Sequence, residues 1–175
     1  MSQVFVSGHK SPDTDSIAAA LSYSYLKRRL GMDAVAVRAG EINKESRFAL
    51  DYFNLEEPIL VTSVARKNPE DEKQKVILVD HNESKQTIDG MDDAEVLEII
   101  DHHRFGDFES ENPIFILVRP VGCVNTVIYG LYKTNPRKPS REIAGIMLSA
   151  IISDTVLFRS PTTTEEDKET AKELA

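Results

Sequence analysis

Two short apolar runs, VILVD (residues 76–80) and VLEIID (residues 96–101), decide the predicted fold class. Each run is almost continuously apolar and ends on an aspartate. Such runs are typical of strands that are buried on both faces of a parallel sheet. Further runs of this kind lie at residues 3–8, 34–40, 59–64 and 114–118.

Helical patterns alternate with these runs along the chain. They cover residues 16–30, 44–54, 122–133, 140–153 and 164–175. Strands that alternate with helices form a parallel sheet with covered faces, and ligands bind beyond the carboxyl ends of such strands. The sequence therefore predicts one α/β domain over residues 1–175, with a mostly parallel sheet and helices on both faces.

The composition excludes several classes of protein. The 175 residues carry a formal net charge of −8, and this acidic balance argues against a broad nucleic-acid surface. The single cysteine, Cys123, forms no internal disulfide and fits a reducing compartment, and we expect it to be a plain buried residue. The sequence shows neither the apolar core of a signal peptide nor a run long enough to span a bilayer. We therefore expect a cytoplasmic protein.

Side chains that bind metal ions gather after three of the predicted strands. The segments are SGHKSPDTD (residues 7–15), VILVDHNE (residues 76–83) and EIIDHHR (residues 98–104), and they contain all four histidines of the chain. Because the carboxyl ends of parallel strands meet at one edge, we expect these side chains to lie together. The candidates are His9, Asp13, Asp15, Asp80, His81, Asp101, His102 and His103.

A fourth segment, GIMLSAIISDTVLF (residues 145–158), adds Asp154 to the candidates. Its helix is apolar almost all round, which predicts that it is buried. A carboxylate near the end of a buried helix meets the negative end of the helix dipole in poorly solvating surroundings. A nearby cation would offset that cost.

Each candidate has a structural explanation when it is considered alone. Asp15 is well placed to cap the helix that starts at Ser16. Asp101 could support a metal-bound histidine, and Asp154 could pair with a buried arginine. A structural explanation of the whole set requires several independent coincidences at one edge of one sheet. We therefore interpret the set as a metal site.

The types of donor narrow the choice of metal and of reaction. Carboxylates and imidazoles without a thiolate suit manganese, cobalt, magnesium or iron better than a structural zinc. The candidate ligands are too many for one ion that keeps open positions. Two ions about 3.5–4 Å apart, bridged by shared aspartates, would use them all, and this arrangement is usual for hydrolysis at phosphorus by an acidified bridging water.

The same segments resemble a known family. GHKSPDTDS, VILVDHNE, IIDHHR and AIISDTVLF, together with PVGC (residues 120–123) and SDTVLFRSPTTTEED (residues 153–167), are similar to the family II inorganic pyrophosphatases of the DHH phosphoesterase superfamily. The resemblance implies a Rossmann-like DHH domain. It also implies an inorganic diphosphatase, which hydrolyses pyrophosphate to two phosphates by means of a hydroxide that bridges two metal ions.

The resemblance implies a role for each candidate. One manganese ion, or cobalt in its place, would be held by His9, Asp13, Asp80 and Asp154. The other would be held by Asp15, Asp80, His102 and Asp154, so that Asp80 and Asp154 bridge the pair. His103 would bind the substrate and serve catalysis together with Asp80. His81 and Asp101 would support the ligands, and magnesium would accompany the substrate.

The family builds its active site between two lobes, and the second lobe clamps pyrophosphate with lysine and arginine side chains. This chain contains no such motif, so the resemblance implies the N-terminal catalytic lobe alone, with the clamping lobe absent. It also implies a homodimer. Some members carry a regulatory CBS insert near the position of residues 63–75, and the sequence does not distinguish a naturally short loop from an excised insert.

Two other functions stay open at this point. Other DHH enzymes cleave oligonucleotides, cyclic dinucleotides or polyphosphate, although the acidic charge weighs against nucleotide substrates. The chain could also be an isolated metal-binding and dimerising lobe that has no turnover by itself.

Overall fold

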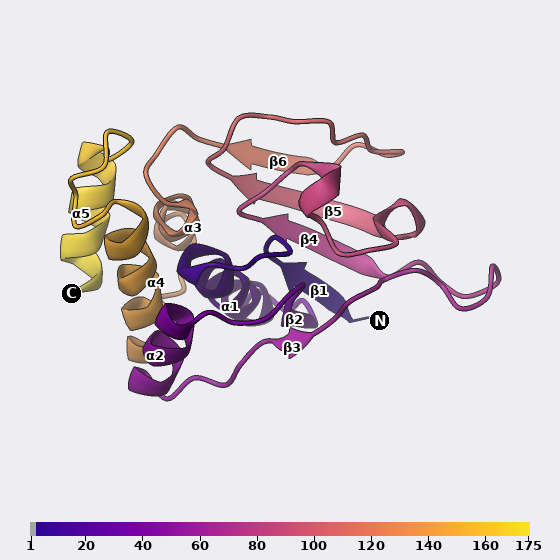
Figure 1. Ribbon diagram of the computed structural model, residues 1–175, viewed down its shortest axis with the longest axis horizontal. Helices are drawn as coiled ribbons and strands as arrows, with labels where there is room; N and C mark the ends of the chain where they lie inside the picture. Colours follow the sequence, from indigo (N-terminus) through magenta and orange to yellow (C-terminus); the bar gives the residue numbers. More distant parts are fainter. Residues whose placement is uncertain (1–2) are drawn as a thin grey trace.

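The computed structural model describes residues 3–175 and contains a six-stranded sheet in which every paired strand is parallel (Figure 1). The strand order is β3-β2-β1-β4-β5-β6. The order reverses between β1 and β4, which makes the carboxyl ends of these two strands the switch point of the sheet. The strands are β1 (Val4–Ser7), β2 (Ala34–Arg38), β3 (Ile59–Leu60), β4 (Lys75–Val79), β5 (Glu95–Asp101) and β6 (Phe115–Val118).

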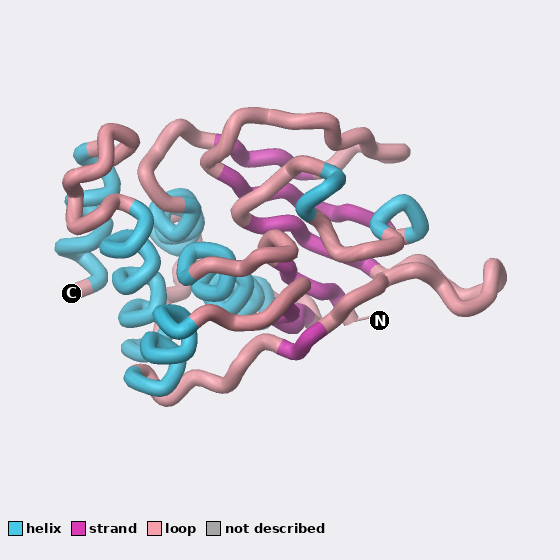
Figure 2. The backbone as a smooth tube through the Cα atoms, in the orientation of Figure 1, coloured by secondary structure: helices cyan, strands magenta, loops and turns pink. Residues whose placement is uncertain are grey.

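The α-helices gather on one side of the sheet, as Figure 2 shows. α1 and α3 pack directly on the strands, α4 packs on α1, and α5 packs on α4. The helices are α1 (Thr14–Arg29), α2 (Lys44–Tyr52), α3 (Val124–Lys133), α4 (Arg141–Asp154) and α5 (Glu165–Leu174), and two short 3-10 helices are η1 (Ser84–Gln86) and η2 (Met91–Asp93). The predicted α/β class and the parallel sheet are confirmed.

The second face of the sheet is covered differently from what the sequence pattern predicts. Side chains alternate along each strand, so that Val4 and Val6 face the α-helices while Phe5 faces the opposite side. On that opposite side the apolar cover comes from Ile88 and Met91, which lie in or beside the short 3-10 helices and loops, and not from long α-helices. The reason lies in the crossovers. Right-handed connections after β4 and β5 pass over this face, and in this protein they contain loops and the short helices η1 and η2 instead of a long helix.

Helix α4 is the buried helix that the sequence predicts. Its side chains Ile146, Met147 and Ile151 are shielded from solvent, because α1, α2, α3 and α5 surround it. Despite its apolar character, none of the helices within residues 3–175 has the combination of length and hydropathy that a membrane span requires. α4 therefore serves as an internal support that carries Asp154 at its last position.

The packing of α2 on α4 depends on the absence of a side chain at Gly145. A Cβ atom built at Gly145 would overlap the ring of Phe53, whereas one built at Gly130 in α3 would meet no atom within 4 Å. We predict that Gly145→Ala lowers the free energy of unfolding by about 1–3 kcal/mol because the ring has to move. Gly130→Ala is the matched control and raises that free energy by about 1 kcal/mol through helix propensity alone.

Urea unfolding followed by circular dichroism measures both variants. Equal changes for Gly130→Ala and Gly145→Ala would show that the contact with Phe53 does not hold α2 in place.

Candidate metal centre

The nine predicted site residues come from three neighbouring strand ends and one helix end. His9, Asp13 and Asp15 follow β1, Asp80 and His81 follow β4, and Asp101, His102 and His103 lie at the end of β5. Because β1, β4 and β5 are adjacent and parallel, these ends share one edge of the sheet. The last residue of α4, Asp154, reaches the same place, since its Oδ2 lies 3.9 Å from His102 Nε2.

A first group of ligand atoms forms around His9. The His9 Nε2 atom lies 3.4 Å from Asp80 Oδ2 and 3.7 Å from Asp13 Oδ2. Asp13 also caps α1, because its Oδ1 accepts a hydrogen bond of 2.9 Å from the backbone N–H of Ser16. The helix therefore begins at Thr14, and the capping position that the sequence suggested for Asp15 belongs to Asp13.

A second group forms around His102. Its Nε2 atom lies 3.3 Å from Asp80 Oδ1 and 3.6 Å from Asp15 Oδ2. The Nδ1 atom of the same ring lies 3.0 Å from the carbonyl oxygen of Val121. A ring that donates from Nδ1 to a carbonyl leaves Nε2 as a free lone pair, which is the form that a metal-binding histidine takes.

Asp80 joins the two groups, because one carboxylate oxygen faces His9 and the other faces His102. Its backbone has a φ of +63°, a left-handed conformation that aspartate tolerates better than most residues. The hydroxyl of Ser16 donates to Oδ2 at 2.8 Å, but Oδ1 is buried and has no hydrogen-bond partner within residues 3–175. A buried carboxylate oxygen without a donor is costly unless a cation satisfies it. The residues present therefore fit a metal ion.

The pKa values of the site residues also indicate that the cluster attracts cations. Burial would lower the pKa of both His9 and His102. The carboxylates of Asp13 and Asp80 nevertheless raise the pKa of His9 to about 10, and those of Asp80 and Asp15 raise the pKa of His102 to about 9. Burial, and then the negative charge of Asp15, raises the pKa of Asp154 to about 11. Without a metal ion, the site therefore holds protons in the positions where it would hold cations.

Asp154 is held in an unusual piece of backbone. The three residues Val156, Leu157 and Phe158 have φ values of +49°, +53° and +61°. Non-glycine residues rarely adopt this left-handed conformation, least of all when they are β-branched. The turn begins directly after Thr155, the C-cap residue of α4, and so follows Asp154 closely.

His103 and Asp101 form a separate pair beside the two groups. Asp101 is buried, and its Oδ1 lies 2.9 Å from His103 Nδ1. The side-chain amide of Asn82 donates to the other oxygen of Asp101 at 2.6 Å. The hydrogen bond between His103 and Asp101 raises the pKa of His103, whose side chain is 53 % exposed. His103 is thus the histidine of the site that faces solvent most openly.

His81 does not join the cluster in the same way. Its ring is buried, its Nδ1 lies 2.9 Å from the carbonyl oxygen of Val79, and its Nε2 has no partner in the described part of the chain. Burial lowers the pKa of His81, which keeps the ring neutral. The nearest ring is that of His9, with centroids 6.5 Å apart. The supporting role predicted for His81 stays a prediction.

Four polar side chains that hold the carboxylates were not predicted from the sequence, and one of them is Asn125, which donates to Asp15 Oδ1 at 2.6 Å. Ser16 donates to Asp80 and Asn82 donates to Asp101. Cys123, which we expected to be a plain buried residue, is buried, but its thiol also donates to Asp15 Oδ1 at 2.8 Å. Residues far apart in the sequence carry no pattern that predicts such contacts, although Ser16 lies within the quoted motif GHKSPDTDS.

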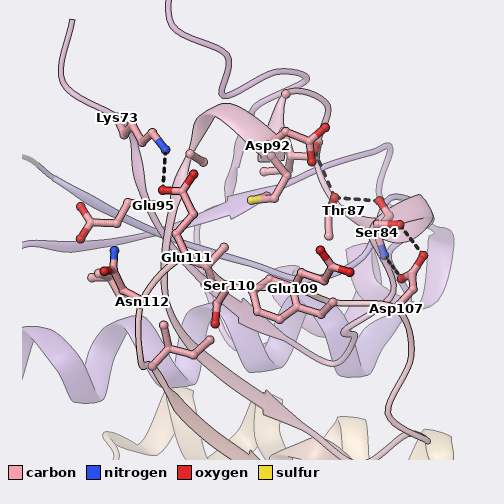
Figure 3. A pocket seen from close by; sticks show the side chains of 18 of the residues that line it. Lys73, Ser84, Thr87, Asp92, Glu95, Asp107, Glu109, Ser110, Glu111 and Asn112 are labelled. Atoms are coloured by element: carbon pink, nitrogen blue, oxygen red, sulfur yellow. Dashed lines mark hydrogen bonds and ion pairs between the residues drawn. The ribbon is translucent and has the colours of Figure 1, made fainter.

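A cavity of about 900 Å³ lies elsewhere, on the second face of the sheet (Figure 3). Apolar side chains such as Ile88 line it, and it is bordered by the ion pair between Lys73 and Glu111. None of the nine predicted site residues is among its lining residues within the described range 3–175. The chemistry of the candidate ligands is therefore concentrated at the open sheet edge and not in this cavity.

The raised histidine pKa values predict how stability changes with pH when metal is absent. His9 and His102 gain protons on folding, so their contribution is complete below about pH 6.5 and is lost as the pH rises through their folded values. We predict that the free energy of unfolding of chelator-treated protein falls as the pH rises from about 6.5 to about 10. Urea unfolding at a series of pH values measures this slope.

The double variant His9→Gln with His102→Gln provides the control. Its slope over the same range should be markedly smaller, because glutamine does not titrate. An unchanged slope in the double variant would assign the pH dependence to other groups.

Comparison with known proteins identifies the family. The model of the DHH family, N-terminal domain, matches residues 3–151. The chain is 54% identical over 175 residues to a probable manganese-dependent inorganic pyrophosphatase of Bacillus licheniformis. It is 51% identical over the same length to a protein of the same description from an Exiguobacterium species. It spans 55% of each of these curated relatives.

Solved structures agree with this result. A candidate family II inorganic pyrophosphatase of Methanococcus jannaschii superposes with a TM-score of 0.88 and 41% identity, over 99% of this chain and 55% of that one. An exopolyphosphatase-related protein of Bacteroides fragilis shares the fold. It superposes with a TM-score of 0.72 and 19% identity, over 98% of this chain and 52% of that protein. The family model, which covers most of the chain, and the arrangement of the strands lead to one conclusion: the chain belongs to the DHH family.

Proposed function

We propose that the chain is the metal-binding lobe of an inorganic pyrophosphatase that uses manganese and hydrolyses pyrophosphate to two phosphates. The observation that carries this proposal is the position of Asp80, whose two oxygens face two separate imidazole and carboxylate groups. Relatives that are about half identical along the whole chain are described as manganese-dependent inorganic pyrophosphatases, which supports the choice of metal and substrate.

Two ions would share the cluster. The first would be held by His9, Asp13, Asp80 and Asp154, and the second by Asp15, Asp80, His102 and Asp154. The distances from His9 Nε2 and His102 Nε2 to the neighbouring carboxylates, 3.3–3.9 Å, support this division except for the place of Asp154 beside the first ion, which the family resemblance implies. The donors are oxygen and imidazole nitrogen, which suits manganese, with cobalt as the alternative ion and magnesium arriving with the substrate.

When bound, the ions supply Lewis acidity that acidifies water and neutralises charge on the phosphoryl oxygens. The chain itself supplies His103 as the group that contacts substrate. Because Asp101 accepts a hydrogen bond from Nδ1, the Nε2 atom of His103 is free to hold or deliver a proton to an oxygen of the leaving phosphate. Asn82 and the backbone N–H groups of His102 and His103 fix Asp101 in turn.

The substrate clamp is proposed to lie outside this lobe. Pyrophosphate is a multiply charged anion, yet none of the ion pairs within residues 3–175 connects a lysine or arginine to the nine site residues. The curated relatives are nearly twice as long as this chain. We therefore assign the cationic clamp to a second lobe that corresponds to the remaining length of the relatives.

Cytoplasmic location and a homodimer belong to the same proposal. The edge strand β6 exposes Phe115 and Ile116, with exposed fractions of 49% and 43%. An unpaired edge strand with exposed apolar side chains supports pairing with a second copy of the chain. The alternative substrates, oligonucleotides or other polyphosphates, are outcomes of the activity test below.

The shared position of Asp80 predicts the behaviour of a variant. Asp80→Asn removes a charge that serves both groups, so the protein should lose tight binding of both Mn²⁺ ions together. Isothermal titration calorimetry measures the number of ions bound. Asp13→Asn is the matched control, because Asp13 lies in the His9 group alone, and it should weaken only one ion. Normal binding of two ions by Asp80→Asn would contradict the bridging assignment.

Release of phosphate from pyrophosphate, and of mononucleotides from a dinucleotide, tests the proposed activity. The Mn²⁺-loaded chain would be assayed alone and fused to the C-terminal part of the Bacillus licheniformis relative, with pyrophosphate and with a dinucleotide. We expect the fusion to cleave pyrophosphate but not the dinucleotide, and the chain alone to be at least about 100-fold slower. His103→Gln in the fusion should lose about 100-fold or more in rate while it still binds two ions. Preferential cleavage of the dinucleotide would contradict the proposal.

A further inference from the structure

The start of helix α3 is built around the carboxylate of Asp15. Four donors from Cys123, Val124 and Asn125 reach it, at distances between 2.6 and 3.3 Å. Asp15 is fully buried and comes from α1, more than 100 residues earlier in the chain. Cys123, the N-cap residue of α3, makes no side-chain cap of its own, so Asp15 takes the place of a capping side chain.

The donors are distributed unequally between the two oxygens of Asp15. Oδ1 accepts from the thiol of Cys123 and from both the backbone and the side-chain N–H groups of Asn125. Oδ2 accepts from the backbone of Val124 and is the oxygen that faces His102 Nε2. Oδ1 is therefore saturated by the protein, and Oδ2 is the oxygen left to face the ligand cluster.

Asn125 is the donor that fixes this orientation most firmly. Its side-chain Nδ2 donates to Asp15 Oδ1 at 2.6 Å and to the backbone oxygen of Asp15 at 3.2 Å. The hydroxyl of Ser22 donates to the Oδ1 atom of Asn125 at 3.0 Å. The reverse orientation of the amide would place its oxygen against two oxygens of Asp15, so the contacts with Asp15 allow only one orientation.

We propose that Asn125 is a positioning residue that holds Asp15 so that Oδ2, which accepts a single hydrogen bond from the backbone of Val124, faces the ligand cluster, and that Ser22 holds the amide of Asn125 in place. All three side chains are buried, so water does not replace a lost donor without rearrangement. Residues that hold metal ligands in this way typically affect metal affinity by about 10–100-fold. The inference rests on the two-ion site of the proposed function.

The proposal predicts an effect on one ion only. Asp15 belongs to the His102 group and not to the His9 group, so a loosened Asp15 should weaken the second ion and spare the first. Asn125→Ala should lower the affinity for that ion by about 10-fold or more. Ser22→Ala should have a smaller effect in the same direction, and the double variant should be no weaker than Asn125→Ala alone, because both act through one amide.

The matched control is Thr126→Val. Thr126 is the next residue of α3 and is equally buried, but its hydroxyl donates to Asp167 at 2.6 Å and not to Asp15. Its loss should lower the free energy of unfolding without changing metal affinity. A difference between Asn125→Ala and Thr126→Val therefore separates the positioning of Asp15 from a general loosening of α3.

Titration of the chain with Mn²⁺, followed by electron paramagnetic resonance, measures both ions and detects the coupled signal of a close pair. We expect the wild type to bind two ions. We expect Asn125→Ala to retain one ion and to lose the coupled signal. Two ions of unchanged affinity in both Asn125→Ala and Ser22→Ala would overturn the role of Asn125 while leaving the proposed function intact. Fewer than two ions in the wild type would overturn both. If Asn125→Ala does not fold, Ser22→Ala decides the question.

Discussion

The other interactions of this protein have to compensate for the mutual repulsion of carboxylates at one edge of its sheet. Asp13, Asp15, Asp80 and Asp154 meet there, and Asp15 and Asp80 are almost completely buried. Burial in the same region as other negative charges is costly. In the absence of metal ions, protons on His9, His102 and Asp154 offset that cost, as their raised pKa values show. Two divalent cations would replace those protons. The cluster whose burial is costly for folding is therefore also the proposed functional centre.

The parallel sheet provides the place where such a cluster can form. β1 and β4 are neighbours at the point where the strand order reverses, and β5 lies next to β4. Loops that leave adjacent strands at the switch point diverge over opposite faces, which opens a space at the carboxyl edge. His9, Asp80 and His102 enter that space from three neighbouring strands of the sheet. α4 then closes one side of it with Asp154, held by the left-handed turn that follows.

A layer of uncharged donors keeps the carboxylates in position. Ser16, Asn82 and Asn125 each donate to a different buried aspartate, and the amino end of α3 donates to Asp15 as well. These contacts leave Oδ1 of Asp80 without a donor and Oδ2 of Asp15 with a single one, and thereby determine which atoms are most available to cations. The site is thus prepared by hydrogen bonds before any ion binds, so little reorganisation is needed on binding.

The sequence by itself determined the fold class, the strands and helices to within a few residues, and the identity of the candidate ligands. It did so because local periodicity fixes secondary structure, and because parallel strands bring their carboxyl ends to one edge whatever the details of packing. Only the tertiary structure decided which carboxylate caps α1, since Asp13 and Asp15 are equivalent in a local pattern. The same holds for the cover of the second sheet face, which follows from the handedness of short crossovers, and for the contact of Asn125 with Asp15. Contacts between residues 110 positions apart are set by packing geometry, and no local pattern in one sequence encodes them.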